Sequence, residues 1–414
     1  MAKALKIVVV GAGIVGVSTA IWLRRAHHDV VLIDKDEPGM AASYGNAGLL
    51  AQWAVVPVTT PGLLKTAPKY LFDPNSPLFM RWSYLPKIAP WLFQFMRHAN
   101  DADARRIAEA LVPIVGDSMQ QHKSLVQGTD VENRLKESNF SFVYEDRKAF
   151  EKDAYGWALR RECGLVPELI EGRAVQEEEP ILGPSINLMA VLKGHGHILN
   201  PGHYVSELAQ FFQNMGGQFV RAEVTDFDLA GDEIQAVDTT KGRFVCSKAV
   251  ITSGIWSKPL MQKLALNVPL ETERGYHVLF KNPSQQPRNP MMMASGKFGV
   301  TPMGNSLRCA GTVELGGIDA GPSRAPIKLL RKKAAQAFPN LTYSDTEEWM
   351  GFRPSTTDSL PLIGELRSTG IFTGFGHQHI GLTAGPKTGR IVADLIDGTH
   401  PNIDLSAYDP MRFS

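Results

Sequence analysis

The chain has little of several features that define whole classes of protein. Its 414 residues include only three cysteines, Cys163, Cys246 and Cys309, which are far apart and form no C-x-x-C pair. We therefore expect neither a disulfide framework nor a metal site, and the composition suits a reducing cytoplasm. Positive and negative charges nearly cancel, with 43 Lys and Arg against 42 Asp and Glu, which argues against nucleic acid as a partner.

Long apolar runs are also absent. No stretch reaches the roughly 18 apolar residues that a membrane-spanning helix needs, and the N-terminus lacks a signal-peptide pattern. Residues 78–98 qualify this expectation, because aromatic side chains gather there among basic ones. Such a segment either contacts the inner membrane peripherally or packs on the body as a helix–turn–helix, since Pro86 and Pro90 argue against one regular helix.

Residues 7–34 are the most informative part of the sequence. An apolar run leads into glycines at the spacing G-x-G-x-x-G, a helical pattern follows, and a second apolar run ends at Asp34. In this setting Gly11 allows a tight turn, Gly13 lets the backbone approach a pyrophosphate, and Gly16 lets helix and strand pack closely. The diphosphate would lie at the helix N-terminus, and Asp34 is placed to accept hydrogen bonds from a ribose. The segment therefore predicts a dinucleotide site.

Nucleotide-binding signals return twice later in the chain, which indicates one sheet domain assembled from distant pieces. We expect an α/β fold with two parts: a Rossmann-like domain formed by residues 1–51, 196–259 and 351–414, and an α+β substrate domain formed by residues 52–195 and 260–350. The first insertion reads as mostly helical and the second as short strands of a mixed or antiparallel sheet. The expected strands are 7–10, 30–33, 218–224, 248–252, 275–280, 298–302, 307–311 and 371–373, the expected helices are 14–25, 204–215 and 387–396, and a hairpin is expected over 227–245.

Five further blocks occur in an order and spacing that are hard to obtain otherwise. They are ASYGNAG at 42–48, KAVITSGIWS at 248–257, RCAGTVEL at 308–315, GFRPSTTDSLPLIG at 351–364 and GFGHQHIGLTAGPKTGRIVADLI at 374–396. With the opening unit, they make the chain resemble the FAD-dependent amine oxidoreductases of the D-amino-acid oxidase family, and most closely the bacterial D-amino-acid dehydrogenases, over essentially its whole length. Two departures leave the substrate more open than the cofactor: Asp34 stands where these enzymes more often have Glu, and SYGNAG differs from the alanine-rich versions of the nearest dehydrogenases.

The resemblance implies that FAD is the cofactor and that the Rossmann-like domain binds it. The glycine turn would hold the pyrophosphate, Asp34 and Lys35 would lie beside the adenosine ribose, and residues 43–48 would approach the flavin ring and ribityl chain. Val224, at the end of its strand, would clasp the adenine through its backbone, and the turn from Gly376 to Thr383 would wrap the pyrimidine end of the ring. The complete implied set is Gly11, Gly13, Ile14, Val15, Gly16, Asp34, Lys35, Ser43, Asn46, Ala47, Gly48, Val224, Ser253, Gly254, Trp256, Gly376, His379, Gly381, Leu382 and Thr383.

Flavin oxidation of an amino acid requires a clamp for the substrate carboxylate rather than a metal or a nucleophile. Arg353 is our candidate, because a guanidinium matches a carboxylate bidentately and stays charged; a structural salt bridge is the alternative. Tyr276 is either a second carboxylate ligand, a lid residue or a packed strand tyrosine, and strand alternation places it opposite His277. His379 would lie over the flavin edge or take the ammonium proton, whereas His377 belongs to the turn itself.

The resemblance therefore implies oxidative deamination of a D-amino acid, or of a D-proline or D-hydroxyproline analogue, by hydride transfer from the α-carbon to the flavin. Electrons would pass to a quinone-type acceptor or an artificial dye. Two alternatives remain open: an oxidase of sarcosine or glycine that reduces oxygen, and a flavin-bearing subunit of a larger complex that is inactive alone. A nicotinamide enzyme is disfavoured, because the chain has no second intact G-x-G-x-x-G unit.

Overall fold

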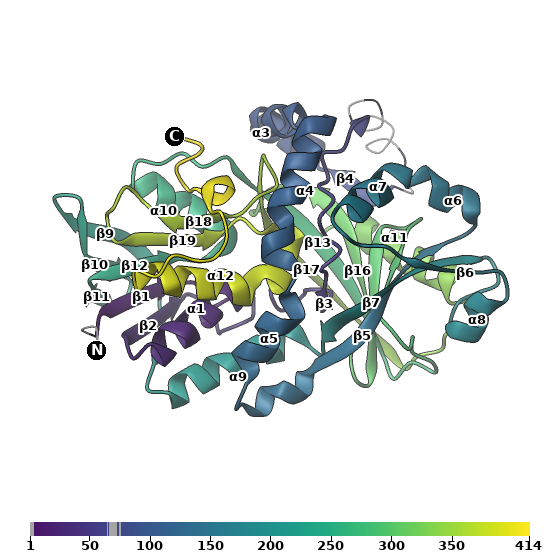
Figure 1. Cartoon of the computed structure of the whole chain (residues 1–414), viewed down its shortest axis with the longest axis horizontal. Helices are drawn as coiled ribbons and strands as arrows, with labels where there is room; N and C mark the ends of the chain where they lie inside the picture. Colours follow the sequence, from purple (N-terminus) through teal and green to yellow (C-terminus); the bar gives the residue numbers. More distant parts are fainter. Residues whose placement is uncertain (1–3, 64, 66–72, 74–75) are drawn as a thin grey trace.

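Two large sheets form the body of the protein and lie side by side in Figure 1. The computed structural model describes residues 4–63, 65, 73 and 76–414. One sheet has six strands, the other has ten, and a three-stranded sheet accompanies the first. This arrangement is the expected α/β fold, with a Rossmann-like part and an α+β part.

The six-stranded sheet has the order β18-β19-β12-β1-β2-β8. Neighbouring strands are parallel except β18 and β19, which are antiparallel. The strands are β1 (Lys6–Val10), β2 (Asp29–Asp34), β8 (Gln218–Arg221), β12 (Lys248–Ile251), β18 (Leu362–Glu365) and β19 (Ile371–Phe375). The sheet is therefore assembled from three distant parts of the chain around its earliest strand.

Both faces of this sheet are covered, which explains why β1 reads as a continuous apolar run. Ile7 and Val9 belong to the core shared with helices α1 (Ile14–Arg25), α9 (Pro201–Asn214) and α12 (Gly381–Ile396). Val8 and Val10 point to the opposite face, where they join a second core. That core includes β9 (Val224–Ala230), β10 (Glu233–Thr239), β11 (Gly242–Val245) and α10 (Ser257–Lys263).

The ten-stranded sheet is mixed, and its main path has the order β17-β13-β16-β15-β14-β5-β7-β3. The pairs β14 with β5 and β16 with β4 are parallel, and the other pairs are antiparallel. Its strands are β3 (Leu49–Leu50), β4 (Leu78–Met80), β5 (Leu135–Tyr144), β6 (Glu168–Glu171), β7 (Leu188–Ile198), β13 (Leu270–Lys281), β14 (Met291–Met293), β15 (Phe298–Pro302), β16 (Ser306–Leu315) and β17 (Asp345–Thr356).

Helices pack around this second sheet. α11 (Arg324–Ala337) shares a core with β13 and β16. The first insertion supplies α3 (Leu85–Arg97), α4 (Asp101–Val115), α5 (Ser118–Val126), α6 (Arg147–Lys152), α7 (Ala154–Glu162) and α8 (Ala174–Glu178), together with β5 and β7. Because α4 and α5 also contact α12, this insertion is tied to the Rossmann-like part.

Two expected helices begin earlier than the sequence indicated: α9 begins at Pro201 rather than Tyr204, and the last helix also begins before its predicted start. The prediction started it at Lys387, after Pro386, but α12 begins at Gly381. A proline inside a helix normally leaves the carbonyl four residues earlier without a partner. Here that carbonyl, of Leu382, accepts a hydrogen bond from Nε2 of His122 at 2.9 Å. The buried histidine thus replaces the missing backbone donor, and burial lowers its pKa to about 4.

The segment after β8 was also predicted incorrectly. The expected strand over 218–224 stops at Arg221, and Val224 begins β9 rather than ending a strand. The expected hairpin over 227–245 is a three-stranded antiparallel sheet. Ala222 and Glu223 separate β8 from β9. The two strands are distinct because they have different partners: β8 pairs with β2, whereas β9 pairs with β10.

Residues 78–98 form β4, a short 3-10 turn and one continuous helix, α3, rather than a helix–turn–helix. Pro86 lies in the first turn of α3, where a backbone N–H would have no partner within the helix. Only Pro90 therefore removes a backbone hydrogen bond from the helix. Ile88, Trp91 and Phe95 are buried, while Trp82 and Phe93 remain 50% and 70% exposed. In the parts of the chain described here, no helix has the length and apolarity needed to cross a membrane.

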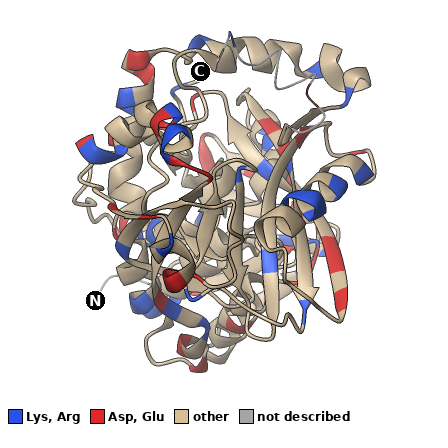
Figure 2. Ribbon diagram, turned by 90° about the vertical axis from the view of Figure 1, so that its right-hand side faces the viewer, with Lys and Arg blue, Asp and Glu red and all other residues tan. Residues whose placement is uncertain are grey.

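Lys and Arg residues and Asp and Glu residues are interspersed along the ribbon in Figure 2, without a region of one sign alone.

The expected domain limits at 195/196 and 350/351 fall inside β7 and β17, both of which belong entirely to the ten-stranded sheet. We therefore propose the same division into two domains with these two strands assigned whole to the substrate domain.

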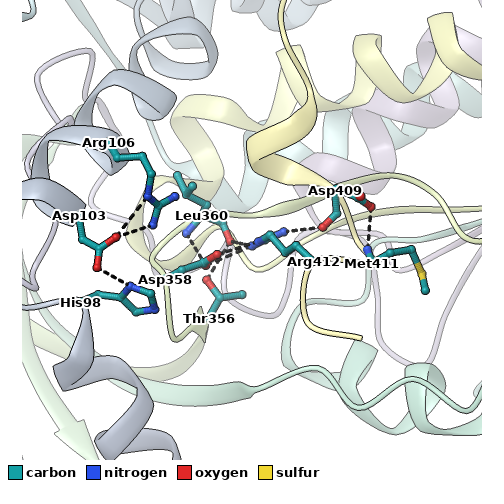
Figure 3. Close-up of polar contacts among 9 residues, drawn as sticks. All are labelled: His98, Asp103, Arg106, Thr356, Asp358, Leu360, Asp409, Met411 and Arg412. Carbon is teal, nitrogen blue, oxygen red and sulfur yellow. Dashed lines mark hydrogen bonds and ion pairs between the residues drawn. The ribbon is translucent and has the colours of Figure 1, made fainter.

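The C-terminal segment is fastened to the loop between β17 and β18 (Figure 3). Arg412 donates from Nε to Asp358 at 2.7 Å and from Nη2 to Asp358 at 3.1 Å and to the Leu360 carbonyl at 2.7 Å. Thr356, the last residue of β17, donates to the same carbonyl at 2.8 Å. The side chains of the ion pair are only 14% and 8% exposed. This bidentate contact therefore links the end of the chain to the strand that carries Arg353.

Replacing Arg412 with Ala is expected to lower the free energy of unfolding by about 3 kcal/mol, because it leaves the Asp358 carboxylate buried without its partner. The matched control is Arg105→Ala, which breaks the exposed ion pairs of Arg105 with Asp101 and Glu162 and should cost much less, because solvent screens exposed pairs. Urea unfolding of both variants measures the difference. Equal losses would mean that the C-terminal contact adds no particular stability.

Candidate active site

A cavity of about 710 Å³ lies between the two large sheets. At one end it is lined by the glycine turn after β1 and by residues that follow β2. At the other end it reaches β13, β16 and β17 of the ten-stranded sheet. The cavity is therefore long enough to bring a dinucleotide held by one sheet against a small molecule held by the other.

The glycine turn is shaped by close backbone contacts. Gly11 has φ +107°, and a Cβ there would lie 2.7 Å from backbone atoms of Thr252. A Cβ on Gly16 would lie 1.8 Å from the carbonyl oxygen of Gly11, so only glycine allows α1 to approach β1 this closely. The hydroxyl of Ser43 accepts a hydrogen bond from the N–H of Ile14 at 3.1 Å, next to Gly13 at the start of α1.

The acidic residue at the end of β2 faces this turn. Oδ2 of Asp34 accepts a hydrogen bond from the Ala12 N–H at 2.6 Å, and Oδ1 accepts one from the Asp36 N–H at 3.0 Å. Burial raises the pKa of Asp34, and these two hydrogen bonds oppose that shift. Lys35 places its ammonium 4.1 Å from the centre of the Trp256 ring. Val224, Ser253 and Gly254 line the same region.

The loop of residues 43–48 is held by two side chains to which the sequence interpretation gave no role. Arg308 donates to the carbonyls of Tyr44 at 3.1 Å and Asn46 at 2.6 Å, and the ring of His277 donates to the Gly45 carbonyl at 3.0 Å. Burial lowers the pKa of Arg308 to about 10 and that of His277 to about 3. The only sequence signal for Arg308 is a cation between the apolar residues Leu307 and Cys309.

Trp349 was also missed by the sequence interpretation, although it lines the cavity. Its ring stacks on His277, with centroids 5.3 Å apart and planes inclined by 19°. A Cβ on Gly45 or Gly351 would lie 1.8 Å or 2.0 Å from the indole. These two glycines therefore make room for an aromatic wall beside the loop 43–48.

Arg353 projects from β17 into the cavity. A Cβ built on Gly275 would lie 2.6 Å from the guanidinium carbon, so the guanidinium extends across the backbone of the neighbouring strand β13. Within residues 4–63, 65, 73 and 76–414, no group forms a hydrogen bond or an ion pair with this guanidinium. Burial lowers the pKa of Arg353, and the nearby carboxyl of Glu273 opposes that shift. The structural salt bridge considered as the alternative is thus not formed.

The turn before α12 brings two histidines to the site in different ways. His379 is exposed to the cavity, and desolvation by the surrounding protein, together with the charge of Arg353, lowers its pKa to about 4, so the ring is neutral at pH 7. His377 lies behind the turn, where Nε2 is 2.9 Å from the Thr388 hydroxyl. Gly376, Gly381 and Leu382 line the cavity together with His379.

Several predicted site residues do not reach the cavity. Tyr276 is a correction: its hydroxyl donates to Glu314 at 2.6 Å and accepts from the Ser323 N–H at 3.1 Å, and its ring belongs to the core under α11. It faces away from His277, as strand alternation predicted. Gly16, Gly48 and Thr383 are also outside the lining. Thr383 accepts from the Ala51 N–H at 3.1 Å, which ties α12 to the chain after β3.

The remaining predicted residues gather along one cavity. It is lined by Gly11, Gly13, Ile14, Val15, Asp34, Lys35, Ser43, Asn46, Ala47, Val224, Ser253, Gly254, Trp256, Arg353, Gly376, His379, Gly381 and Leu382. A helix N-terminus, an acid at the tip of the adjacent strand and a glycine that leaves room for a phosphate fit the diphosphate and ribose of a dinucleotide. These residues would hold FAD at the glycine turn and present its ring toward β17.

Comparisons with known proteins agree with this geometry. A family model described as FAD dependent oxidoreductase (DAO) matches residues 6–395. A D-amino-acid oxidase from Bradyrhizobium diazoefficiens is 38% identical, with 100% of both chains covered. A D-amino acid dehydrogenase from Granulibacter bethesdensis is 26% identical over 99% of this chain and 100% of the relative.

Solved structures share the fold at lower identity. A glycine oxidase from Geobacillus kaustophilus has a TM-score of 0.75 at 22% identity, with 99% of both chains covered. An L-proline dehydrogenase from P. horikoshii also has a TM-score of 0.75, at 19% identity, covering 100% of this chain and 98% of the other. From its cavity, its motifs and these matches, the chain belongs to the DAO family of FAD-dependent oxidoreductases, with FAD as its cofactor.

Proposed function

We propose that this enzyme oxidises the bond between the α-carbon and the nitrogen of a D-amino acid, releasing the imine that water then hydrolyses to a keto acid and ammonia. The observation that carries the proposal is the Arg353 guanidinium, which extends into the cavity without a hydrogen-bonding partner in the part of the chain described. A planar cation in this position suits the carboxylate of an amino acid, which it can bind through two parallel hydrogen bonds.

Three side chains line the part of the cavity in which the substrate would bind. Arg353 holds the substrate carboxylate and thereby orients the α-carbon. The neutral ring of His379 lies near Arg353, and Trp53 contributes an apolar wall. The Trp53 ring is fixed by stacking on Phe140, with centroids 4.7 Å apart. FAD, when bound, supplies the hydride acceptor. An apolar wall favours substrates with uncharged side chains, including proline and hydroxyproline analogues.

The D configuration is supported by the names of the whole-length relatives, which are D-amino-acid oxidases and dehydrogenases. The electron acceptor is a separate question. Our leading proposal is a quinone-type acceptor, with the enzyme on the cytoplasmic side and the exposed Trp82 and Phe93 against the inner membrane. Oxygen is the second candidate, because the relative at 38% identity is named an oxidase.

An anaerobic titration tests the proposed function directly. The purified protein should show a flavin spectrum, and D-amino acids with uncharged side chains or D-hydroxyproline should bleach it, whereas L-amino acids should not. Admitting air, or a soluble quinone, to the bleached enzyme then identifies the acceptor. A flavoprotein that no amino acid bleaches would contradict the proposal and favour a subunit that is inactive alone.

Replacing Arg353 with Ala is expected to leave FAD bound and to raise KM for the amino acid by at least thirtyfold. Loss of a charge-assisted clamp for a buried carboxylate costs about 2–4 kcal/mol. Arg353→Lys should recover only part of this, because an ammonium cannot form the planar pair. Steady-state kinetics with matched flavin content measure the effect. An unchanged KM in Arg353→Ala would remove this residue from the substrate site.

Gly275→Ala is expected to raise KM as well, although residue 275 itself offers no side-chain functional group. The added methyl would occupy the space of the Arg353 guanidinium and force it to turn away. Gly321→Ala is the control, because nothing lies within 4 Å of a Cβ at that position. Kinetics of both variants decide the matter, and an effect of similar size in both would show that the arginine does not depend on the gap at Gly275.

A further inference from the structure

A second ionisable group lines the same cavity beside Arg353. Glu273 on β13 lies directly opposite Arg353 on β17 in the antiparallel register. Its side chain is buried, with the residue 8% exposed, and it contributes to the cavity wall. Facing residues of this kind have their Cβ atoms about 4.5–5.5 Å apart and share one face of the sheet. An acid and a base so placed would normally pair with each other.

These two side chains do not form that pair. No ion pair joins Glu273 to Arg353 within the described part of the chain, although each influences the pKa of the other. The reason is geometric, because the guanidinium extends across Gly275, two residues further along β13, and so away from Glu273. The cavity wall therefore presents a cation and an acid side by side, each still able to bind an opposite charge.

Other ionisable residues of β13 show that this state is particular to the cavity face. Arg274, the next residue, points to the opposite face and donates from Nη1 to Glu314 at 2.7 Å and from Nη2 to the Gly321 carbonyl at 2.8 Å. Glu271 accepts hydrogen bonds from the Tyr84 hydroxyl at 3.0 Å and from the Thr272 N–H at 2.8 Å. Charges outside the cavity on this strand thus have protein partners.

We propose that Glu273 binds the ammonium group of the substrate, so that Glu273 and Arg353 together recognise an amino acid as its zwitterion. An α-amino acid carries a cation and an anion on one carbon, and the wall offers the complementary pair on two neighbouring strands. This inference rests on the proposed function, since it requires an amino-acid substrate. It names a specificity-determining residue, because a plain carboxylic acid would engage Arg353 but leave Glu273 without a ligand.

The pair also explains how a carboxyl can be tolerated at this depth. Burial raises the pKa of Glu273, and the charge of Arg353 and the Ser355 side chain oppose the shift, so the charged form is helped by a nearby cation. The substrate ammonium supplies a second cation at the moment of binding. Such mutual stabilisation favours ligands that carry both charges over those that carry only one.

The test compares two ligands that differ only in the amino group. One is the D-amino acid that bleaches the flavin most effectively, and the other is the same acid without its nitrogen, which is propanoate if the first is D-alanine. The dissociation constant of the amino acid comes from the saturation of the anaerobic bleaching rate. That of the deaminated acid comes from calorimetry and from its competition with the amino acid.

Glu273→Gln should weaken binding of the amino acid about tenfold or more, as expected for loss of a charged hydrogen bond, and should leave the deaminated acid bound equally or more tightly. Arg353→Ala should weaken both ligands. Glu271→Gln, the same change two residues away on the same strand and outside the cavity lining, should affect neither. Flavin content and melting temperature confirm that each variant is folded.

Two outcomes would overturn the inference. Equal affinity of Glu273→Gln and the wild type for the amino acid would exclude Glu273 as a ligand. An equal loss for both ligands would show that Glu273 serves only to position Arg353. Failure of the wild type to be bleached by any amino acid is a different result, which would contradict the proposed function itself.

Discussion

The pairing of β13 with β17 is the interaction on which the site depends. The two strands pair without a break from Leu270 opposite Thr356 to Lys281 opposite Asp345. This ladder sets Arg353 opposite Glu273 and Gly351 opposite Gly275. The two glycines leave room on that face for the Arg353 guanidinium and the Trp349 ring. A slip of one residue would turn every one of these side chains to the other face. The register therefore determines the chemistry of the cavity as much as the identities of the residues do.

Two arginines shape the electrostatics of the cavity, alongside the carboxyls in its wall, which include Glu273. Arg308 is buried and Arg353 is half-buried, and neither forms an ion pair with a carboxylate in the described chain, in contrast to Arg274 on the far face. The start of α1 adds the positive end of a helix dipole. A cavity of this character suits ligands with negative groups at both ends, which here are a diphosphate and a carboxylate. The histidines around it add no charge at neutral pH, because desolvation lowers the pKa of His277 to about 3 and, together with Arg353, lowers that of His379 to about 4.

The parts of the structure set by local sequence were predictable, and those set by distant partners were not. The bounds of α1 and the tight packing at Gly16 follow from the glycine spacing alone. By contrast, α12 extends through Pro386 only because His122 supplies a donor from another helix. Tyr276 was predicted as a site residue and Glu273 was not, because sequence alone does not show which face of β13 meets the cavity; in the structure Glu273 lines it and Tyr276 packs in the core on the other face. Arg308 acts through carbonyls of a loop more than 260 residues away in sequence, which no local pattern reveals.

The order of the strands in the six-stranded sheet has a consequence for synthesis of the protein. β1 is made before the other strands of this sheet, whereas its neighbour β12 ends at Ile251 and the next strand, β19, ends at Phe375. The glycine turn is therefore synthesised long before the residues that complete its cavity. FAD can gain its full set of contacts only after the turn of residues 376–382 has also been made.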